Sequence, residues 1–253
     1  TFTFHKNPLQ EGDTLRMSIG IDNIGDLPMD SLDVAFFLYD DARRKIELPT
    51  ARLDSLRTGG MLTATLRVDS TFGLAGNASL WVEANPYNYH HQDEQTHFNN
   101  LAEIRFNVDR DRINPILDVT FDGVHLMDGD IVSAKPFISV QLRDENRYLA
   151  LNDTSKFKVY LKTPSSGSMQ RVYFSNAVQG AMLDFIPAML PKNSCRIDWK
   201  PVFTDDGKYY LEVEAADRSN NESGRNNYRI SFEVVNRASI TQVLNYPNPF
   251  STS

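Results

Sequence analysis

TLRMSIGID, residues 14–22, carries the pattern that decides the fold. Apolar side chains occupy every second position of this stretch, at Leu15, Met17, Ile19 and Ile21. A period of two places alternate side chains on opposite faces of a β-strand, so one face is buried and the other meets water. The segments MLTATLRV (61–68) and AEIRFNV (102–108) repeat the alternation. The pattern predicts antiparallel sheets with one buried face.

Two other segments, LDVAFFLYD (32–40) and ASLWVEA (78–84), are apolar on both faces, which predicts central or covered strands. A second series of short strands follows: ILDVTF (116–121), PFISVQL (136–142), FKVYLK (157–162), RVYF (171–174), RIDWK (196–200), KYYLEVEA (208–215) and YRISFEVV (228–235). Residues typical of turns separate the strands, and no segment has the period of a helix. The sequence therefore predicts an all-β protein.

A charged stretch that ends at Pro115 separates the two series of strands. We therefore expect one domain over residues 1–108, a second over 109–237, and a linker with the start of a further domain over 238–253. Each domain has the size and strand spacing of an immunoglobulin-like β-sandwich. The predicted architecture is two such antiparallel sandwiches in tandem.

Composition narrows the range of functions. The 253 residues carry a net charge of −7 without a lysine or arginine cluster, which argues against nucleic acid and anionic membranes as partners. No apolar run has the length of a membrane span. The single cysteine, Cys195, excludes an internal disulfide.

Residues 8–108 resemble the bacterial cell-adhesion-related (CARDB-like) domain, an immunoglobulin-like β-sandwich. The motifs that carry this likeness are Glu11-Gly12-Asp13, Asn23-Ile24-Gly25, Leu56 to Gly60, Gly76 before Leu80-Trp81-Val82, Asn85-Pro86-Tyr87-Asn88, Asp93-Glu94 and Asn99-Asn100. The second domain is similar, over 118–146 and 204–224, to the immunoglobulin-like domain that precedes the sorting domain of type IX secretion substrates in Bacteroidetes.

The stretch LNYPNPF (244–250) contains two prolines that prevent it from joining a helix or a central strand. Together with Val243 it resembles the start of the type IX C-terminal sorting domain, through Tyr246, Pro247, Asn248, Pro249 and Phe250. The order of modules resembles that of large gingipain-type cysteine peptidases. The resemblance implies a fragment of an extracellular or cell-surface protein whose partners are its own upstream domains and the secretion machinery.

Each candidate reactive group also has an ordinary structural role. A catalytic cysteine needs a histidine base, but all histidines except His125 fall in the first domain, so we expect Cys195 to be a structural residue. The loop from His90 to His97 holds side chains that bind transition metals, yet its spacing matches no closed ligand pattern, and we expect a solvated polar loop. We assign no catalytic, cofactor or confident metal residue.

Two weaker possibilities remain. Oxygen donors in Asp217, Asn220 and Glu222, and in Asp128-Gly129-Asp130, could bind calcium, although Asp and Asn are also the residues that turns prefer. Aromatic residues at and near the 85–100 loop could bind a glycan or protein through Tyr87, Tyr89 and His90. Phe98 and Trp81 could join them, but we expect Trp81 to belong to the core.

These observations favour non-catalytic accessory modules that space and orient an upstream domain, the fragment itself being no enzyme. The alternative is adhesion, or binding of a surface glycan or protein, through the 85–100 loop. An autonomous hydrolase would require a concave site with clustered titratable groups.

Overall fold

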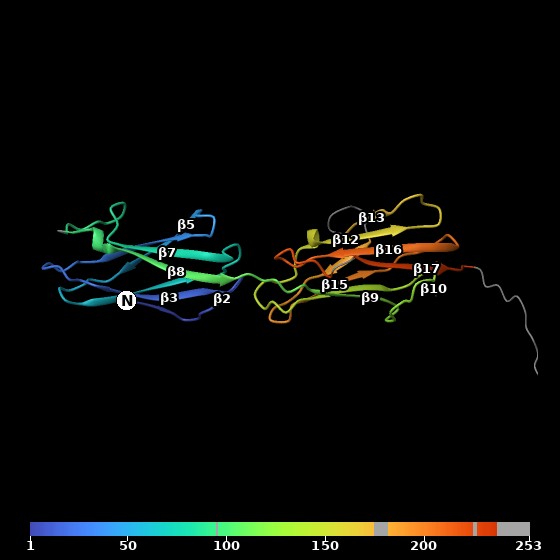
Figure 1. Cartoon of the computed structure of the whole chain (residues 1–253), viewed down its shortest axis with the longest axis horizontal. Helices are drawn as coiled ribbons and strands as arrows, with labels where there is room; N and C mark the ends of the chain where they lie inside the picture. The colour runs from blue at the N-terminus through green and yellow to red at the C-terminus, as the bar shows by residue number, and fades with distance from the viewer. Residues whose placement is uncertain (95, 175–181, 225–226, 237–253) are drawn as a thin grey trace, which may run out of the picture. The chain divides into compact units, whose positions relative to one another are not determined.

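The computed structural model describes residues 1–94, 96–174, 182–224 and 227–236 (Figure 1). The chain divides into two compact units, Thr1–Arg112 and Ile113–Ser253. The division lies slightly beyond the boundary expected after Val108, because the last strand of the first unit continues to Asp109. The carbonyl of Asp109 accepts a hydrogen bond from Glu11 N at 2.9 Å, so this residue still belongs to the first unit.

The first unit is a sandwich of two sheets. The smaller sheet has the order β1-β3-β6, formed by Phe2–Phe4, Leu15–Asp22 and Met61–Val68. The larger sheet has the order β2-β8-β7-β4-β5, formed by Leu9–Gln10, Leu101–Asp109, Gly76–Ala84, Leu32–Tyr39 and Lys45–Leu53. All neighbours are antiparallel except β2 and β8, which run parallel.

The core of the first unit follows the alternation of its strands. Leu15, Met17 and Ile19 of β3 face inward, while the residues between them face outward. Strands β4 and β7 lie inside the larger sheet, each with a neighbour on both sides, as their apolar composition predicted. Buried side chains from both sheets form one cluster, which includes Phe36 and Leu80.

The second unit repeats the two-layer design. One sheet has the order β14-β15-β11-β9, formed by Leu183–Ile186, Ser194–Trp199, Ile138–Arg143 and Ile116–Phe121. The other has the order β10-β17-β16-β12-β13, formed by Asp130–Val132, Tyr228–Val234, Gly207–Ala215, Phe157–Lys162 and Gln170–Val172. Two short 3-10 turns complete the described elements, η1 at Phe98–Asn100 and η2 at Thr154–Lys156.

Aromatic packing closes the core of the second unit. Tyr209 and Phe232 stack with their ring centroids 5.5 Å apart, and Phe203 packs against both rings. The Tyr209 hydroxyl donates to the carbonyl of Asp205 at 3.0 Å, four residues upstream in the chain. A tyrosine at the start of this strand that bonds back to the preceding corner is characteristic of immunoglobulin-like sandwiches.

In both units, the first strand is divided between the two sheets in the same way. In the first unit, β1 pairs with β3 in the small sheet, after which the chain crosses and β2 pairs in parallel with the last strand, β8. In the second unit, β9 pairs with β11, and β10 pairs in parallel with the last strand, β17. The two units therefore share an immunoglobulin-like strand order, except that the sheet of β9, β11 and β15 has a fourth strand, β14.

Some strands were not expected from the sequence. Strand β5 contains Pro49, which removes a backbone donor, but β5 lies at the edge of its sheet and its pairing with β4 has a register shift between Val34 and Phe36. Proline is tolerated at edges and bulges for this reason. The expected strand 171–174 is shorter, because β13 ends at Val172 and Phe174 forms only an isolated bridge. Among the described residues, no helix is long and apolar enough to cross a membrane.

The core assignment can be tested with Leu80→Ala. Leu80 is fully buried in β7, so its truncation should lower the free energy of unfolding by about 2–5 kcal/mol. Denaturant titration in a Trp199→Phe background reports the first unit through Trp81. The control, Ser79→Ala, changes the neighbouring residue on the opposite face and should cost no more than about 0.5 kcal/mol. Equal losses from the two substitutions would contradict this core.

Candidate functional site

The connection from β7 to β8 is built around Asn85. This residue is 2% exposed and has a left-handed backbone with φ 52°, a conformation that asparagine tolerates better than most residues. Its side-chain amide donates to Gln92 O at 2.8 Å and to Glu94 Oε1 at 2.7 Å, and its carbonyl oxygen Oδ1 accepts from Gln92 N at 2.8 Å. A single buried side chain thus folds the 85–100 loop back onto the end of β7.

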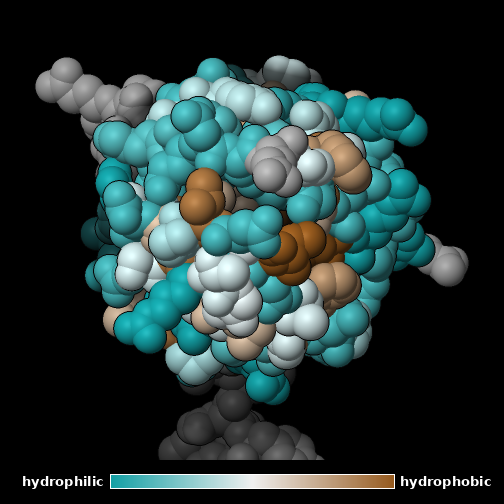
Figure 2. Space-filling model, turned by 90° about the vertical axis from the view of Figure 1, so that its left-hand side faces the viewer, coloured by the Kyte–Doolittle hydropathy of each residue, from teal (hydrophilic) through white to brown (hydrophobic). Residues whose placement is uncertain are grey.

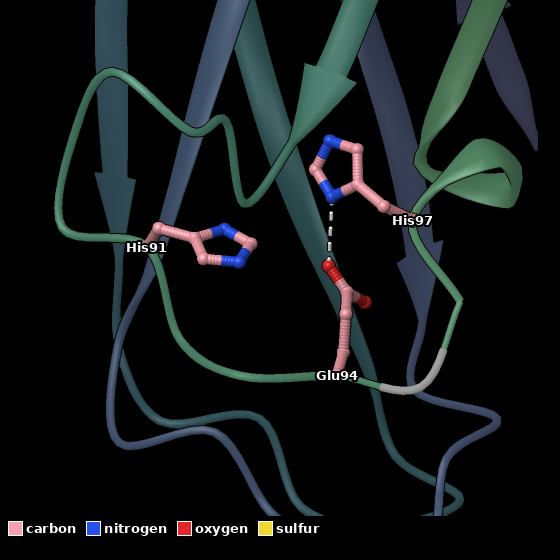
Figure 3. Close-up of side chains that lie close together, drawn as sticks. All are labelled: His91, Glu94 and His97. Atoms are coloured by element: carbon pink, nitrogen blue, oxygen red, sulfur yellow. Dashed lines mark hydrogen bonds and ion pairs between the residues drawn. The ribbon is translucent and has the colours of Figure 1, made fainter.

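This folding brings His91, Glu94 and His97 together (Figure 3). Each is half-buried, and their side chains converge from different parts of the loop, with one ligand atom from each lying within 4.8 Å of the others. Glu94 Oε1 accepts hydrogen bonds from His97 Nδ1 at 3.0 Å and from Asn100 Nδ2 at 2.6 Å. The sequence suggested a solvated loop, whereas the structure shows a half-buried cluster.

The outer nitrogens of the two imidazoles also have partners. His91 Nδ1 donates to the backbone carbonyl of Asn85 at 3.0 Å, and His97 Nε2 lies 3.2 Å from Glu83 Oε1. Burial opposes protonation of His97, but the hydrogen bonds and charges of Glu94 and Glu83 outweigh it and raise the pKa of His97. The sequence does not mark Glu83 and Asn100 as parts of this cluster, because their roles depend on contacts across the loop.

Tyr87 and Tyr89, expected as ligand-binding residues, are 64% and 51% exposed. The Tyr87 ring packs on His97 at 4.2 Å and on His91 at 4.5 Å between centroids, so it also covers the histidine pair. His90 is directed elsewhere: its Nδ1 lies 3.0 Å from the buried carboxylate of Asp33. The structure thus separates His90 from the cluster that its neighbour His91 joins.

Figure 2 shows the end of the first unit that carries these loops. The face is mostly hydrophilic, with a few separate apolar patches. A hollow of about 530 Å³ lies between residues 92–94, 96 and 99–100 on one side and residues 21–29 on the other. Ile24 and Leu27 at its rim are strongly exposed.

Trp81 does not belong to the core, which corrects the expectation from the sequence. It is half-buried on the outer face of the larger sheet, because its neighbours Leu80 and Val82 take the inward positions of β7. Its ring packs edge-on against Tyr39 at 6.2 Å, in an open groove of about 860 Å³ that Arg43 also lines. Trp81 is therefore separate from the platform considered for Tyr87 and Tyr89.

The residues suggested for calcium hold turns in the second unit. Asp217 is buried and accepts hydrogen bonds from the backbone and side-chain amides of Asn221 at 2.8 and 2.7 Å. The Asn220 side chain accepts from Lys156 Nζ at 2.5 Å, and Glu222 is exposed. One carboxylate oxygen of Asp217 lies within 4.8 Å of one from Asp144. Calcium binding at this loop stays a prediction.

In the second calcium candidate, residues 128–130, the carboxylates also accept hydrogen bonds from the protein. Asp128 Oδ1 accepts from the backbone nitrogen and the hydroxyl of Ser231, both at 2.8 Å. These bonds hold the pKa of Asp128 below its ordinary value. Asp130 Oδ2 accepts from Met127 N at 2.8 Å. Asp128 thus fastens the start of β10 to β17, and Asp130 closes the turn that precedes β10.

Cys195 lies in β15, where its thiol is 1% exposed and belongs to the core of the second unit. Burial raises its pKa to about 12. His125, which shares the unit, forms a hydrogen bond from its Nε2 to Asp118 Oδ1 at 2.6 Å.

The residues Tyr246, Pro247, Asn248, Pro249 and Phe250 lie outside the described part of the chain.

No known protein family and no curated protein matches the chain. Among solved structures, it is similar to red sea bream transglutaminase, at 8% identity and a TM-score of 0.34 over 94% of this chain and 31% of that one. It is also similar to dimeric latent PorU from Porphyromonas gingivalis, at 10% identity and a TM-score of 0.36 over 90% and 22%. A marsupial T cell receptor gives 9% identity and a TM-score of 0.30 over 94% and 73%. The chain thus spans less than a third of the first two proteins, and none of these likenesses bears on function.

The burial of Cys195 predicts an inert thiol. With a pKa of about 12, only about one molecule in ten thousand carries the thiolate at pH 8, so a thiol-reactive disulfide reagent should label the folded protein far more slowly than the denatured one. Because the ordinary pKa is 9.0, the neutral thiol stabilises the fold fully below pH 9 and loses this contribution as the pH rises towards 12. Rapid labelling of the folded chain would contradict the assignment.

Proposed function

We propose that the chain forms two non-catalytic accessory modules that space and orient a neighbouring domain in a larger exported protein. The sequence resemblance to CARDB-like and immunoglobulin-like modules, and to the start of a type IX sorting domain, supports export to the cell surface. In this proposal, a gingipain-type peptidase domain precedes the modules, and the secretion machinery acts on the sorting domain that follows. The architecture of the two units supports the spacer role.

The observation that carries this proposal is that a strand near the start of each unit pairs in parallel with the last strand of that unit. Strand β2 runs in the same direction as β8, and β10 runs in the same direction as β17. The chain therefore enters each unit at one end and leaves it at the opposite end. A pull on the two termini slides the paired strands along each other, so the backbone hydrogen bonds of these short ladders, of two and three residue pairs, are loaded together. This arrangement suits a module that transmits force without extending.

The use of polar groups within the fold also favours a structural role. Asp217, Asp128 and Asn193 hold turns through hydrogen bonds at 2.7–2.9 Å. The thiol of Cys195 is buried in an apolar core. Groups of these types would be needed for catalysis, but here they stabilise loops and sheets.

The spacer role predicts a clear mechanical signature. Pulling the chain by its ends with optical tweezers should give two cooperative unfolding events, each releasing roughly 35–45 nm of chain at about 3.5 Å per residue. Ile131→Pro should lower the unfolding force of the second unit only, because proline disturbs the pairing of β10 with β17.

The matched control is Ile131→Thr, which should leave the unfolding force unchanged because this side chain is strongly exposed. Gradual extension at low force, without discrete events, would contradict the spacer proposal.

A second candidate function is adhesion through the 85–100 loop. The observation that favours it is the exposure of Tyr87 and Tyr89 on one ordered connection, since exposed aromatic side chains are common anchors for sugars and proteins. The ligand would be a surface glycan or a surface protein.

Adhesion predicts that Tyr89→Ala reduces binding at least about tenfold in a glycan array or a cell-surface binding assay. Tyr210→Ala is the control, because Tyr210 is an exposed tyrosine of the second unit. Equal binding by the wild-type chain and Tyr89→Ala would remove Tyr89 from the ligand site, and absence of binding by the wild-type chain would remove the adhesion proposal.

A further inference from the structure

We propose that His91, Glu94 and His97 bind a transition-metal ion of the zinc type, which fastens the 85–100 loop. This site is independent of the spacer function. Its three side chains supply two imidazole nitrogens and one carboxylate oxygen, a donor set that suits zinc and related divalent ions. A fourth position would be taken by water.

The distances are close to those that a metal requires. The three ligand atoms lie within 4.8 Å of one another, whereas tetrahedral zinc with bonds of 2.0–2.1 Å places its ligands about 3.3–3.5 Å apart. His97 Nδ1 and Glu94 Oε1 already lie 3.0 Å apart, so a small change in the side-chain torsion angles of His91 would complete the site. Their side chains already point towards a common centre (Figure 3).

The surrounding hydrogen bonds determine which ring nitrogen of each histidine would bind the metal. His91 Nδ1 donates to the carbonyl of Asn85, which leaves the lone pair on Nε2 for a metal. His97 Nε2 faces the Glu83 carboxylate, which leaves Nδ1 directed at the cluster beside Glu94. Metal-binding histidines usually donate their other N–H to a backbone carbonyl or a carboxylate, and both forms occur here.

Glu94 is positioned in a similar way. The amides of Asn85 and Asn100 both donate to its Oε1, which fixes the carboxylate next to His97. A metal ion would replace the proton that His97 Nδ1 shares with Glu94, and this proton would leave to solvent. Tyr87 packs over both imidazole rings and shields one side of the cluster from water.

The experiment uses the whole chain after removal of metals with a chelator. Calorimetric titration with Zn²⁺ should show one site in the micromolar range or tighter, and saturating Zn²⁺ should raise the melting temperature of the first unit by roughly 5–10 °C. Co²⁺ should give the intense visible absorption of a tetrahedral site. Nitrogen-15 spectra of the imidazoles should show Zn²⁺ on Nε2 of His91 and on Nδ1 of His97.

Variants locate the site. His91→Ala and His97→Ala should each weaken Zn²⁺ binding at least about a hundredfold, and Glu83→Gln should weaken it about 10–100-fold through loss of orientation. His90→Ala is the matched control, because His90 is adjacent in sequence but contacts Asp33. It should bind Zn²⁺ like the wild-type chain.

Three results would overturn the proposal: no change in melting temperature at millimolar Zn²⁺, equal affinity in His91→Ala, or nitrogen spectra that show metal on other histidines. The spectra are recorded on the wild-type chain, so they remain informative if a variant fails to fold.

Discussion

Each unit depends on the division of its first strand between two sheets. A sheet with one apolar face is stable in water only when that face is covered, and two such sheets must therefore stay in register across a shared core. In the first unit, β1 belongs to the small sheet and β2 to the large one, so one continuous segment ties the layers together. Strands β9 and β10 do the same in the second unit. The same pairing directs the chain from one end of each sandwich to the other.

The two units share this division, and in both of them buried polar side chains hold the connections between strands. In the second unit, the Asn193 side chain holds the segment 146–151, Asp217 holds a single turn, and the aromatic core around Tyr209 closes the corner before β16. In the first unit, Asn85 organises a long connection with two half-buried histidines. A loop of this length is expected to be variable or functional. Here the buried Asn85 amide holds residues 92 and 94 close to the end of β7.

The position of this connection keeps the mechanical and chemical proposals independent of each other. The spacer role requires that the sandwiches resist extension, and the cluster of His91, Glu94 and His97 involves none of the pairs between β2 and β8. A metal ion could therefore stiffen the loop without altering the path of force through the unit. Tyr87 lies over the same cluster, so the rigidity of the loop would also fix the position of an exposed aromatic side chain.

The sequence by itself determined the strand faces and the all-β class, because the alternation in segments such as 14–22 is a local property that fixes which side chains can be buried together. It did not reveal β2 or β10, since strands of two or three residues form only when a partner strand is in place. It also placed Trp81 in the core, because an apolar segment does not show which face is covered. The histidine cluster was decided by tertiary structure alone. Ligand spacing along a loop carries no fixed geometry. Residues 91, 94 and 97 meet at one point through hydrogen bonds to Asn85, Glu83 and Asn100, which depend on the folded loop.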